Sequence, residues 1–97
     1  MDVKKILELV VKAVRMHLDK RYKIYLFGSQ SKNRAGPHSD LDIALLGDRS
    51  IQPMTMVQIK ESMDQLPTLR TIDVLDLRSA SRDFREAVLK EGILMHE

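Results

Sequence analysis

Two apolar runs, joined by a loop that begins with Gly-Ser and ends with Asp-x-Asp, constrain the fold of this chain more than any other feature. The first run, residues 24–27, ends in Gly28-Ser29, and the second, residues 43–46, directly follows Asp40-Leu41-Asp42. A tight turn after one strand, with two alternating acids opening the next, is typical of a metal-dependent site that handles phosphates. Without this segment, the chain could be any small α/β domain.

The spacing of the acids suits such a site. Residues i and i+2 of a strand point to the same face, about 6.5–7 Å apart along the chain, so Asp40 and Asp42 can direct two carboxylates at one spot. Two Mg²⁺ ions held there would bind the attacking and leaving oxygens of an in-line displacement. Gly28 lets the backbone approach a phosphate closely, and Ser29 can cap a short helix whose free N–H groups attract anions.

Each half of this pattern is common when it occurs alone. An Asp-x-Asp pair is frequent on solvated strand edges, and Gly-Ser is an ordinary turn; only their combination is specific. A Walker loop is excluded because the chain has no GxxxxGK[ST] sequence. An EF-hand is excluded because no third alternating acid, sharp-turn glycine or closing glutamate follows Asp42.

A third acid is expected from the β-branched, apolar run at residues 71–77, which contains Asp73 and Asp76. Being three positions apart, these two acids face opposite sides of a strand, so only one can join the pair. Asp73 is the candidate, because it lies inside the run, where an unpaired carboxylate is costly to bury. Asp76 lies near the end of the run and is expected to be a solvated strand end.

Together these motifs resemble the minimal nucleotidyltransferase domain of the DNA polymerase β superfamily. That family usually has G-S-x-A-x-G before its acids, and this chain has GSQSKN at residues 28–33. Asn33 replaces the second glycine, and asparagine tolerates the left-handed conformation better than most residues. The resemblance covers nearly the whole chain and is closest to the small stand-alone members encoded beside an all-helical HEPN protein.

The resemblance implies a reaction in which a hydroxyl attacks the α-phosphate of a nucleoside triphosphate and pyrophosphate leaves. Asp40 and Asp42 would hold two Mg²⁺ ions, and Asp73 would complete the site of the catalytic ion and help to deprotonate the hydroxyl. The triphosphate would be bound by Gly28, Ser29 and the loop cation Lys32. Roles for Arg34 and His38 stay open.

The acceptor is implied by the resemblance alone. Larger relatives bind it on a second domain, for which a chain of 97 residues has no room. The closest relatives transfer AMP from ATP to a tyrosine of a HEPN toxin and act as its antitoxin, in a type VII toxin–antitoxin pair. Two alternatives are a two-protein enzyme with an unknown small substrate bound by the HEPN subunit, and a non-catalytic module that neutralises its partner by occlusion. A homodimer and a hetero-oligomer are both compatible with the sequence.

Length and composition bear on the number of domains, the cellular location and the binding of nucleic acid. We expect residues 1–97 to form one domain. The chain has no cysteine, which suits a reducing cytoplasm, and no apolar run long enough to span a membrane. A net charge of +2 and an aromatic content of 4% argue against direct binding of nucleic acid.

The pattern predicts an α/β fold in the order α-β-α-β-α-β-α, with helices flanking a small mixed sheet. The expected helices cover about 3–20, a short helix or turn at 29–34, one from Pro53 to Pro67, and one capped by Ser79 or Ser81 and stopped by Gly92. The expected strands cover 22–27, 40–46 and 70–77, and 93–95 form a short closing segment. The last helix is expected to carry the apolar residues Phe84, Ala87 and Val88, and Arg82 and Arg85 are assigned to a solvated face.

Overall fold

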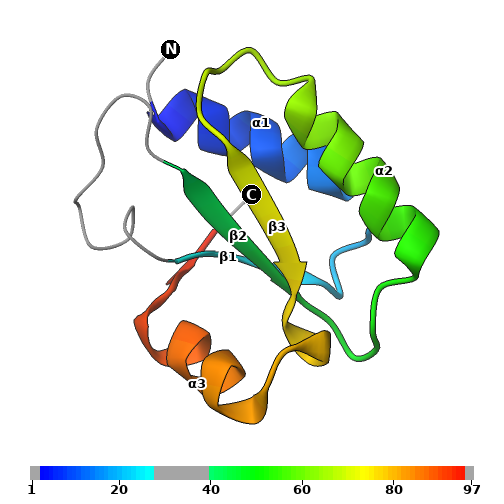
Figure 1. Ribbon diagram of the computed structural model, residues 1–97, viewed down its shortest axis with the longest axis vertical. Coiled ribbons are helices and arrows are strands. Elements are labelled where there is room, and N and C mark those ends of the chain that lie inside the picture. Colours follow the sequence, from blue (N-terminus) through cyan, green and yellow to red (C-terminus); the bar gives the residue numbers. More distant parts are fainter. Residues whose placement is uncertain (1–2, 28–39, 96–97) are drawn as a thin grey trace.

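The described part of the chain forms a four-stranded mixed sheet with helices on both faces (Figure 1). The computed structural model describes residues 3–27 and 40–95. The strands lie in the order β3-β2-β1-β4; β2 and β3 are parallel, and β1 is antiparallel to β2 and β4. This confirms the predicted fold class. The elements are α1 (Val3–Arg15), β1 (Lys23–Phe27), β2 (Leu41–Leu46), α2 (Pro53–Asp64), β3 (Ile72–Asp76), the 3₁₀ turn η1 (Leu77–Ser79), α3 (Arg82–Glu91) and β4 (Ile93–Leu94).

The two faces of the sheet carry separate apolar clusters. Alternate residues of a strand point to opposite faces, and the odd-numbered residues of β2 pack with α1 and α2 in the main core. The even-numbered residues Ala44 and Leu46 join a smaller cluster with Leu77 and Val88. The main core includes Ile6, Val10, Val14, Ile24, Leu41, Ile43, Leu45, Ile59 and Met63. The apolar residues of α1 and α2 therefore cover one face of the sheet.

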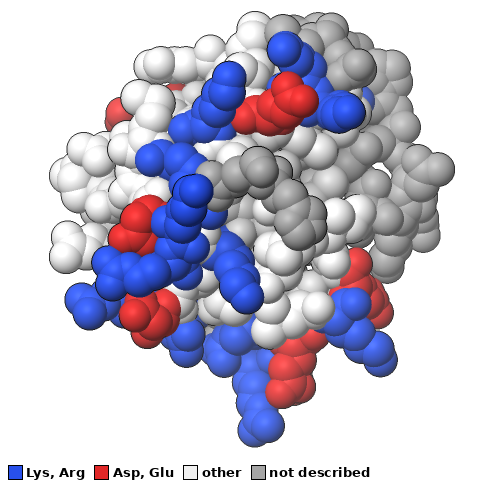
Figure 2. Space-filling view, turned by 180° about the vertical axis from the view of Figure 1, so that it is seen from behind, with Lys and Arg blue, Asp and Glu red and all other residues white. Residues whose placement is uncertain are grey.

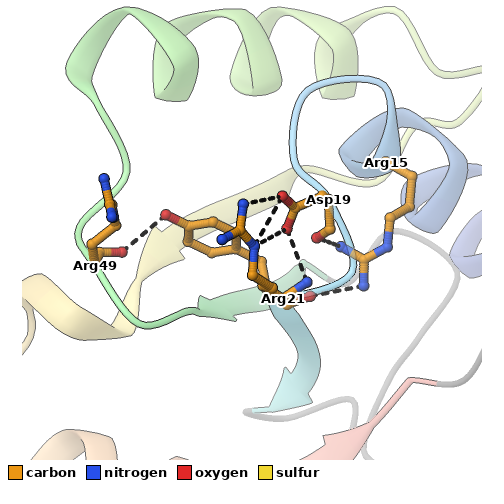
Figure 3. Close-up of polar contacts among 5 residues, drawn as sticks. Arg15, Asp19, Arg21 and Arg49 are labelled. Carbon is orange, nitrogen blue, oxygen red and sulfur yellow. Dashed lines mark hydrogen bonds and ion pairs between the residues drawn. The ribbon is translucent and has the colours of Figure 1, made fainter.

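The first helix is shorter than its apolar pattern suggested, ending at Arg15 and not near Lys20. The Arg15 guanidinium donates to the carbonyl oxygens of Asp19 (2.8 Å) and Tyr22 (2.7 Å), so the chain folds back around this side chain (Figure 3). Arg21 also pairs with the Asp19 carboxylate at 2.9 Å. After this turn, β1 begins at Lys23, one residue later than the predicted start of the strand at Tyr22.

The remaining helix boundaries agree with the turn chemistry in the sequence. Pro53 occupies the first turn of α2, and the helix ends at Asp64, before Pro67. Of the two serines considered as caps for the last helix, Ser81 is the N-cap, and its hydroxyl accepts the Phe84 N–H at 3.2 Å.

Gly92 ends the last helix for a different reason from the one expected. Its φ is −74°, so it is not a left-handed cap. A Cβ added there would lie 2.6 Å from the Val88 carbonyl oxygen and 3.3 Å from that of Leu26. The glycine is therefore required for space, because it lets the chain pass close to β1. The closing segment then pairs with β1 as β4, and Leu26 lies opposite Ile93.

One assignment on the last helix was wrong. α3 carries Phe84, Ala87 and Val88 as expected; of these, Val88 is buried, Ala87 is exposed and Phe84 is 40% exposed. Arg85 is half-buried, and its guanidinium donates to the carbonyl oxygens of Leu77 (3.0 Å) and Ala80 (3.3 Å). Arg85 thus ties α3 to η1, whereas Arg82 is exposed, as expected.

Two expected segments, the short helix or turn at 29–34 and the loop at 35–38, lie outside the described residues. Among the helices of residues 3–27 and 40–95, none has the length and apolar character that crossing a membrane requires.

Candidate active site

Asp42 and Asp73 lie side by side on two parallel strands. They are direct partners in the β2–β3 register. Neighbouring strands are about 4.7–4.9 Å apart, and partner residues point to the same face. On its other side, Asp42 is partnered by Phe27 of β1. The sheet therefore presents two carboxylates on the face that carries the smaller apolar cluster and α3.

Asp40 contributes to the same electrostatic site. It is exposed, precedes β2 directly, and lies two residues before Asp42. The pKa of the half-buried Asp42 carboxyl is raised above its ordinary value of 3.8, first by burial, then by the negative charges of Asp73 and Asp40. Asp73 and Asp40 thus make the negative charge of Asp42 less favourable, and a bound cation would offset this effect.

Asp76 has a structural role, and the expectation of a merely solvated strand end was incomplete. Its Oδ2 accepts the Ile51 N–H at 2.8 Å, and its Oδ1 accepts the Arg78 N–H at 3.0 Å as the N-cap of η1. The Arg78 guanidinium in turn donates to the Gly47 carbonyl oxygen at 2.6 Å. Asp76 therefore fastens the loop after β2, while Asp73 faces the acids, as their opposite orientation predicts.

The donor set fits a cation that is shared with a substrate. Within residues 3–27 and 40–95, no three His, Cys, Asp or Glu side chains form a ready-made metal cluster. Mg²⁺ is usually bound through one or two carboxylates, with substrate phosphates and waters as its other ligands. The in-register pair Asp42 and Asp73, with Asp40 nearby, supplies hard oxygen donors of that kind.

An aromatic pair next to the acids was not recognised from the sequence. The rings of Phe27 and Phe84 meet edge to face, with their centroids 5.6 Å apart. Since Phe27 partners Asp42, this pair places the exposed Phe84 ring beside the acidic site. The one signal was the position of Phe27, directly before the glycine turn; no sequence pattern pointed to Phe84.

The residues predicted to bind the triphosphate, Gly28, Ser29 and Lys32, lie outside the described residues, as do Arg34 and His38. The described structure places only the elements on each side of them. Phe27 ends β1 directly before Gly28, and Asp40 directly precedes β2.

One group of basic residues lies away from these acids. Exposed basic residues follow α1 and the turn after it, and Lys and Arg form a band across the face shown in Figure 2. Because α1 packs on the main core, it lies on the opposite sheet face from Asp42. The exposed basic residues in this part of the chain are Lys4, Lys5, Lys12, Lys20, Arg21 and Lys23.

Comparison with known proteins agrees with this arrangement. Residues 10–97 match the family described as "Polymerase beta, Nucleotidyltransferase". The chain is 29% identical, over its full length and 85% of the relative, to the probable protein adenylyltransferase MntA of Haemophilus influenzae. It is also 30% identical to the protein adenylyltransferase MntA of Shewanella oneidensis, over 86% of this chain, but it spans only 59% of that relative.

Solved structures also resemble this chain in fold and sequence. A toxin–antitoxin crystal structure with AMP-PNP is 28% identical, with a TM-score of 0.71 over 90% of this chain and 69% of that one. A tri-AMPylated Shewanella oneidensis HEPN toxin in complex with its MNT antitoxin matches at 26% identity, with a TM-score of 0.72 over 94% of this chain and 69% of that one. A minimal nucleotidyltransferase matches at 25% identity, with a TM-score of 0.75 over 98% of this chain and 97% of that one.

Proposed function

Since the chain belongs to the polymerase β nucleotidyltransferase family, we propose that it transfers AMP from ATP to a tyrosine hydroxyl of a HEPN partner and thereby acts as its antitoxin. The observation that carries the proposal is the in-register pair of Asp42 and Asp73 with Asp40 beside it. The adenylyl group and the HEPN partner come from the relatives, which are protein adenylyltransferases and toxin–antitoxin complexes.

The three acids have different proposed roles, which follow from their positions in the sheet. Asp40 and Asp42 open β2 and would hold Mg²⁺, and Asp73 would join them from β3. Two bound Mg²⁺ ions would supply charge neutralisation at the attacking and leaving oxygens. The oxygen of the acceptor hydroxyl bonds to the α-phosphorus as the bond from that phosphorus to the bridging oxygen breaks. Asp73 takes the proton of the hydroxyl, and pyrophosphate leaves.

The glycine turn after β1 is the proposed triphosphate site. Gly28 and Ser29 follow Phe27 directly, and Phe27 is the β1 partner of Asp42. Backbone N–H groups of such a turn can bind phosphate oxygens, and Lys32 would add a positive charge. Positioning and electrostatic stabilisation supply most of the catalysis in phosphoryl transfer, so these short elements suffice.

The setting of the reaction is also a proposal. We place it in the cytoplasm, where a chain without cysteine is at no disadvantage. Residues 1–97 would act as a single catalytic domain that shares its acceptor site with the partner.

The proposal is tested by incubating the chain and its HEPN partner with Mg²⁺ and ATP and measuring the intact mass of both. We expect the partner to gain one or more adenylyl groups and lose its toxic activity. A control without Mg²⁺ should show neither change. Neutralisation without any gain in mass would contradict the proposed reaction and support neutralisation by occlusion.

A further inference from the structure

Asp73 lies on β3, at one edge of the sheet, and within residues 3–27 and 40–95 no other strand pairs with the outer side of β3. In a parallel ladder, alternate residues turn their backbone groups toward the neighbouring strand. The Leu41 N–H donates to the Thr71 carbonyl oxygen at 2.8 Å, so the odd-numbered residues of β3 face β2. The backbone N–H and C=O groups of Ile72 and Val74 therefore point outward. No residue in the described part of the chain pairs with these groups.

A groove of about 440 Å³ follows the same edge, between α2 and the η1–α3 segment. Figure 1 shows β3 running between these elements. Its lining includes Met56 and Lys60 of α2, Leu75 of β3 and Phe84 of α3. The groove begins at Val74, one residue beyond Asp73. We call it the β3-edge groove.

The order of the strands fixes the side from which an acceptor can approach. An in-line displacement needs the attacking and leaving oxygens on opposite sides of the phosphorus. The proposed triphosphate site follows β1, on one side of Asp42, and Asp73 lies on the other side. The leaving pyrophosphate therefore belongs on the β1 side, and the acceptor hydroxyl comes from the free edge of β3.

Resting on the function proposed above, we propose that the all-helical partner presents its acceptor tyrosine on an extended segment outside its helices, and that this segment pairs with the outer edge of β3. The outward backbone groups of Ile72 and Val74 bind this segment as an added strand, and its flanking side chains fill the β3-edge groove. A tyrosine opposite Asp73 then points to the same sheet face as the acids, with its Cβ about 4.5–5.5 Å from that of Asp73.

The lining of the groove specifies the chemistry of the segment. In the bound segment, the residue two positions from the tyrosine has its side chain on the same face and lies against Leu75 and the exposed ring of Phe84. An apolar residue suits this position. At odd spacing from the tyrosine, a side chain points to the opposite face, toward α2, where Met56 and Lys60 lie. The ammonium of Lys60 suits an acidic residue there. The occupant is thus a tyrosine-bearing strand with an apolar neighbour and an acid.

Two groove variants with matched controls test this proposal kinetically. Phe84→Ala and Lys60→Glu alter the groove. Leu89→Ala is a comparable truncation, and Lys90→Glu the same charge reversal, at exposed positions of α3 that do not line the groove. We expect each groove variant to lower kcat/KM for AMP transfer to the HEPN partner by about tenfold or more, mainly by raising the KM for the partner. The affinity for Mg²⁺-ATP should match that of the controls in both groove variants, and the melting temperature of Lys60→Glu should match that of Lys90→Glu.

Hydrogen exchange measured by NMR tests the pairing itself. The amides of Ile72 and Val74 should exchange quickly in the free protein and become protected when the HEPN partner binds. Protection confined to other segments, or groove variants that match their controls in KM, would overturn the proposal. If the wild-type chain transfers no AMP at all, the proposed function itself fails. Transfer by the wild type without protection of β3 contradicts only the added strand.

Discussion

Asp42 and Asp73 are direct partners across the parallel strands β2 and β3, and Asp42 has Phe27 as its partner on the opposite side. This register concentrates negative charge at one place on the sheet, and the pKa of Asp42 is raised in consequence of burial and of its acidic neighbours. Such unfavourable charge in the free protein is a common cost of a functional site. Substitutions that change this charge should therefore alter the free energy of unfolding as well as the activity.

Removing the charge of Asp42 should stabilise the free protein. In EDTA, Asp42→Asn should raise the melting temperature, because burial of this carboxylate and its repulsion by Asp73 and Asp40 are relieved. A gain of about 1 kcal/mol corresponds to roughly 4–8 °C in a domain of this size. Mg²⁺ with a non-hydrolysable ATP analogue should stabilise the wild type much more than the variant. Equal ligand-induced shifts would show that Asp42 does not hold the cation.

The same carboxyl should give a specific pH dependence. Because the folded pKa of Asp42 lies above 3.8, the folded chain keeps a proton that the unfolded chain releases. The free energy of unfolding therefore falls as pH rises from 3.8 through the raised pKa, and the loss persists above it. In EDTA, the advantage of Asp42→Asn over wild type should be small below pH 3.8 and grow through this window. A difference that stays constant with pH would argue against this cause.

Asp73 and Asp76 should respond oppositely to the same substitution. Asp73→Asn should lower turnover on the order of 10²-fold or more, because it removes charge at the reacting centre. It should leave the stability of the free protein unchanged or slightly raised, because it relieves the repulsion between Asp73 and Asp42. Asp76→Asn should lower the free energy of unfolding by about 1–2 kcal/mol, because it weakens the bonds to the Ile51 and Arg78 N–H groups. Urea melts and initial rates on both variants check this. A larger loss of turnover in Asp76→Asn would mean that the roles are reversed.

Gly92 should not tolerate a side chain. In Gly92→Ala, the new Cβ would meet the Val88 carbonyl oxygen and approach that of Leu26, and backbone atoms cannot move aside cheaply. We expect a loss of about 1–3 kcal/mol in the free energy of unfolding, measured by urea denaturation. Lys90→Ala, an exposed change on α3, is the control and should stay within about 0.5 kcal/mol of wild type. Equal stability of the two variants would contradict the close approach.

The sequence was sufficient to predict the fold class and the three acids as candidates, because both depend on local spacing. Apolar stripes of period 3.6 identified the helices, and the alternation of acids and apolar residues placed Asp40 and Asp42 on one face of a strand. The three-residue spacing of Asp73 and Asp76 predicted their opposite orientation, which the register and the bonds of Asp76 bear out. The catalytic roles of the acids remain to be tested.

Features that depend on distant segments were not predictable. The contact between Gly92 and the Leu26 carbonyl oxygen exists only because β4 folds back onto β1. Asp76 binds the Ile51 N–H only because the loop after β2 passes that strand end. The first helix ends early because Arg15 binds carbonyl groups in the turn after it, and a helical apolar pattern carries no sign of that competing bond.

The central claim, that the carboxylates around Asp42 catalyse transfer of AMP to the partner, is tested most directly by one measurement. The HEPN partner is incubated with Mg²⁺, ATP and either the wild-type chain or Asp42→Ala, and its intact mass is followed over time. Wild type should add adenylyl groups to the partner, and the variant should do so at a rate lower on the order of 10²–10³-fold, with the complex still formed. Labelling by Asp42→Ala at the wild-type rate would contradict the account.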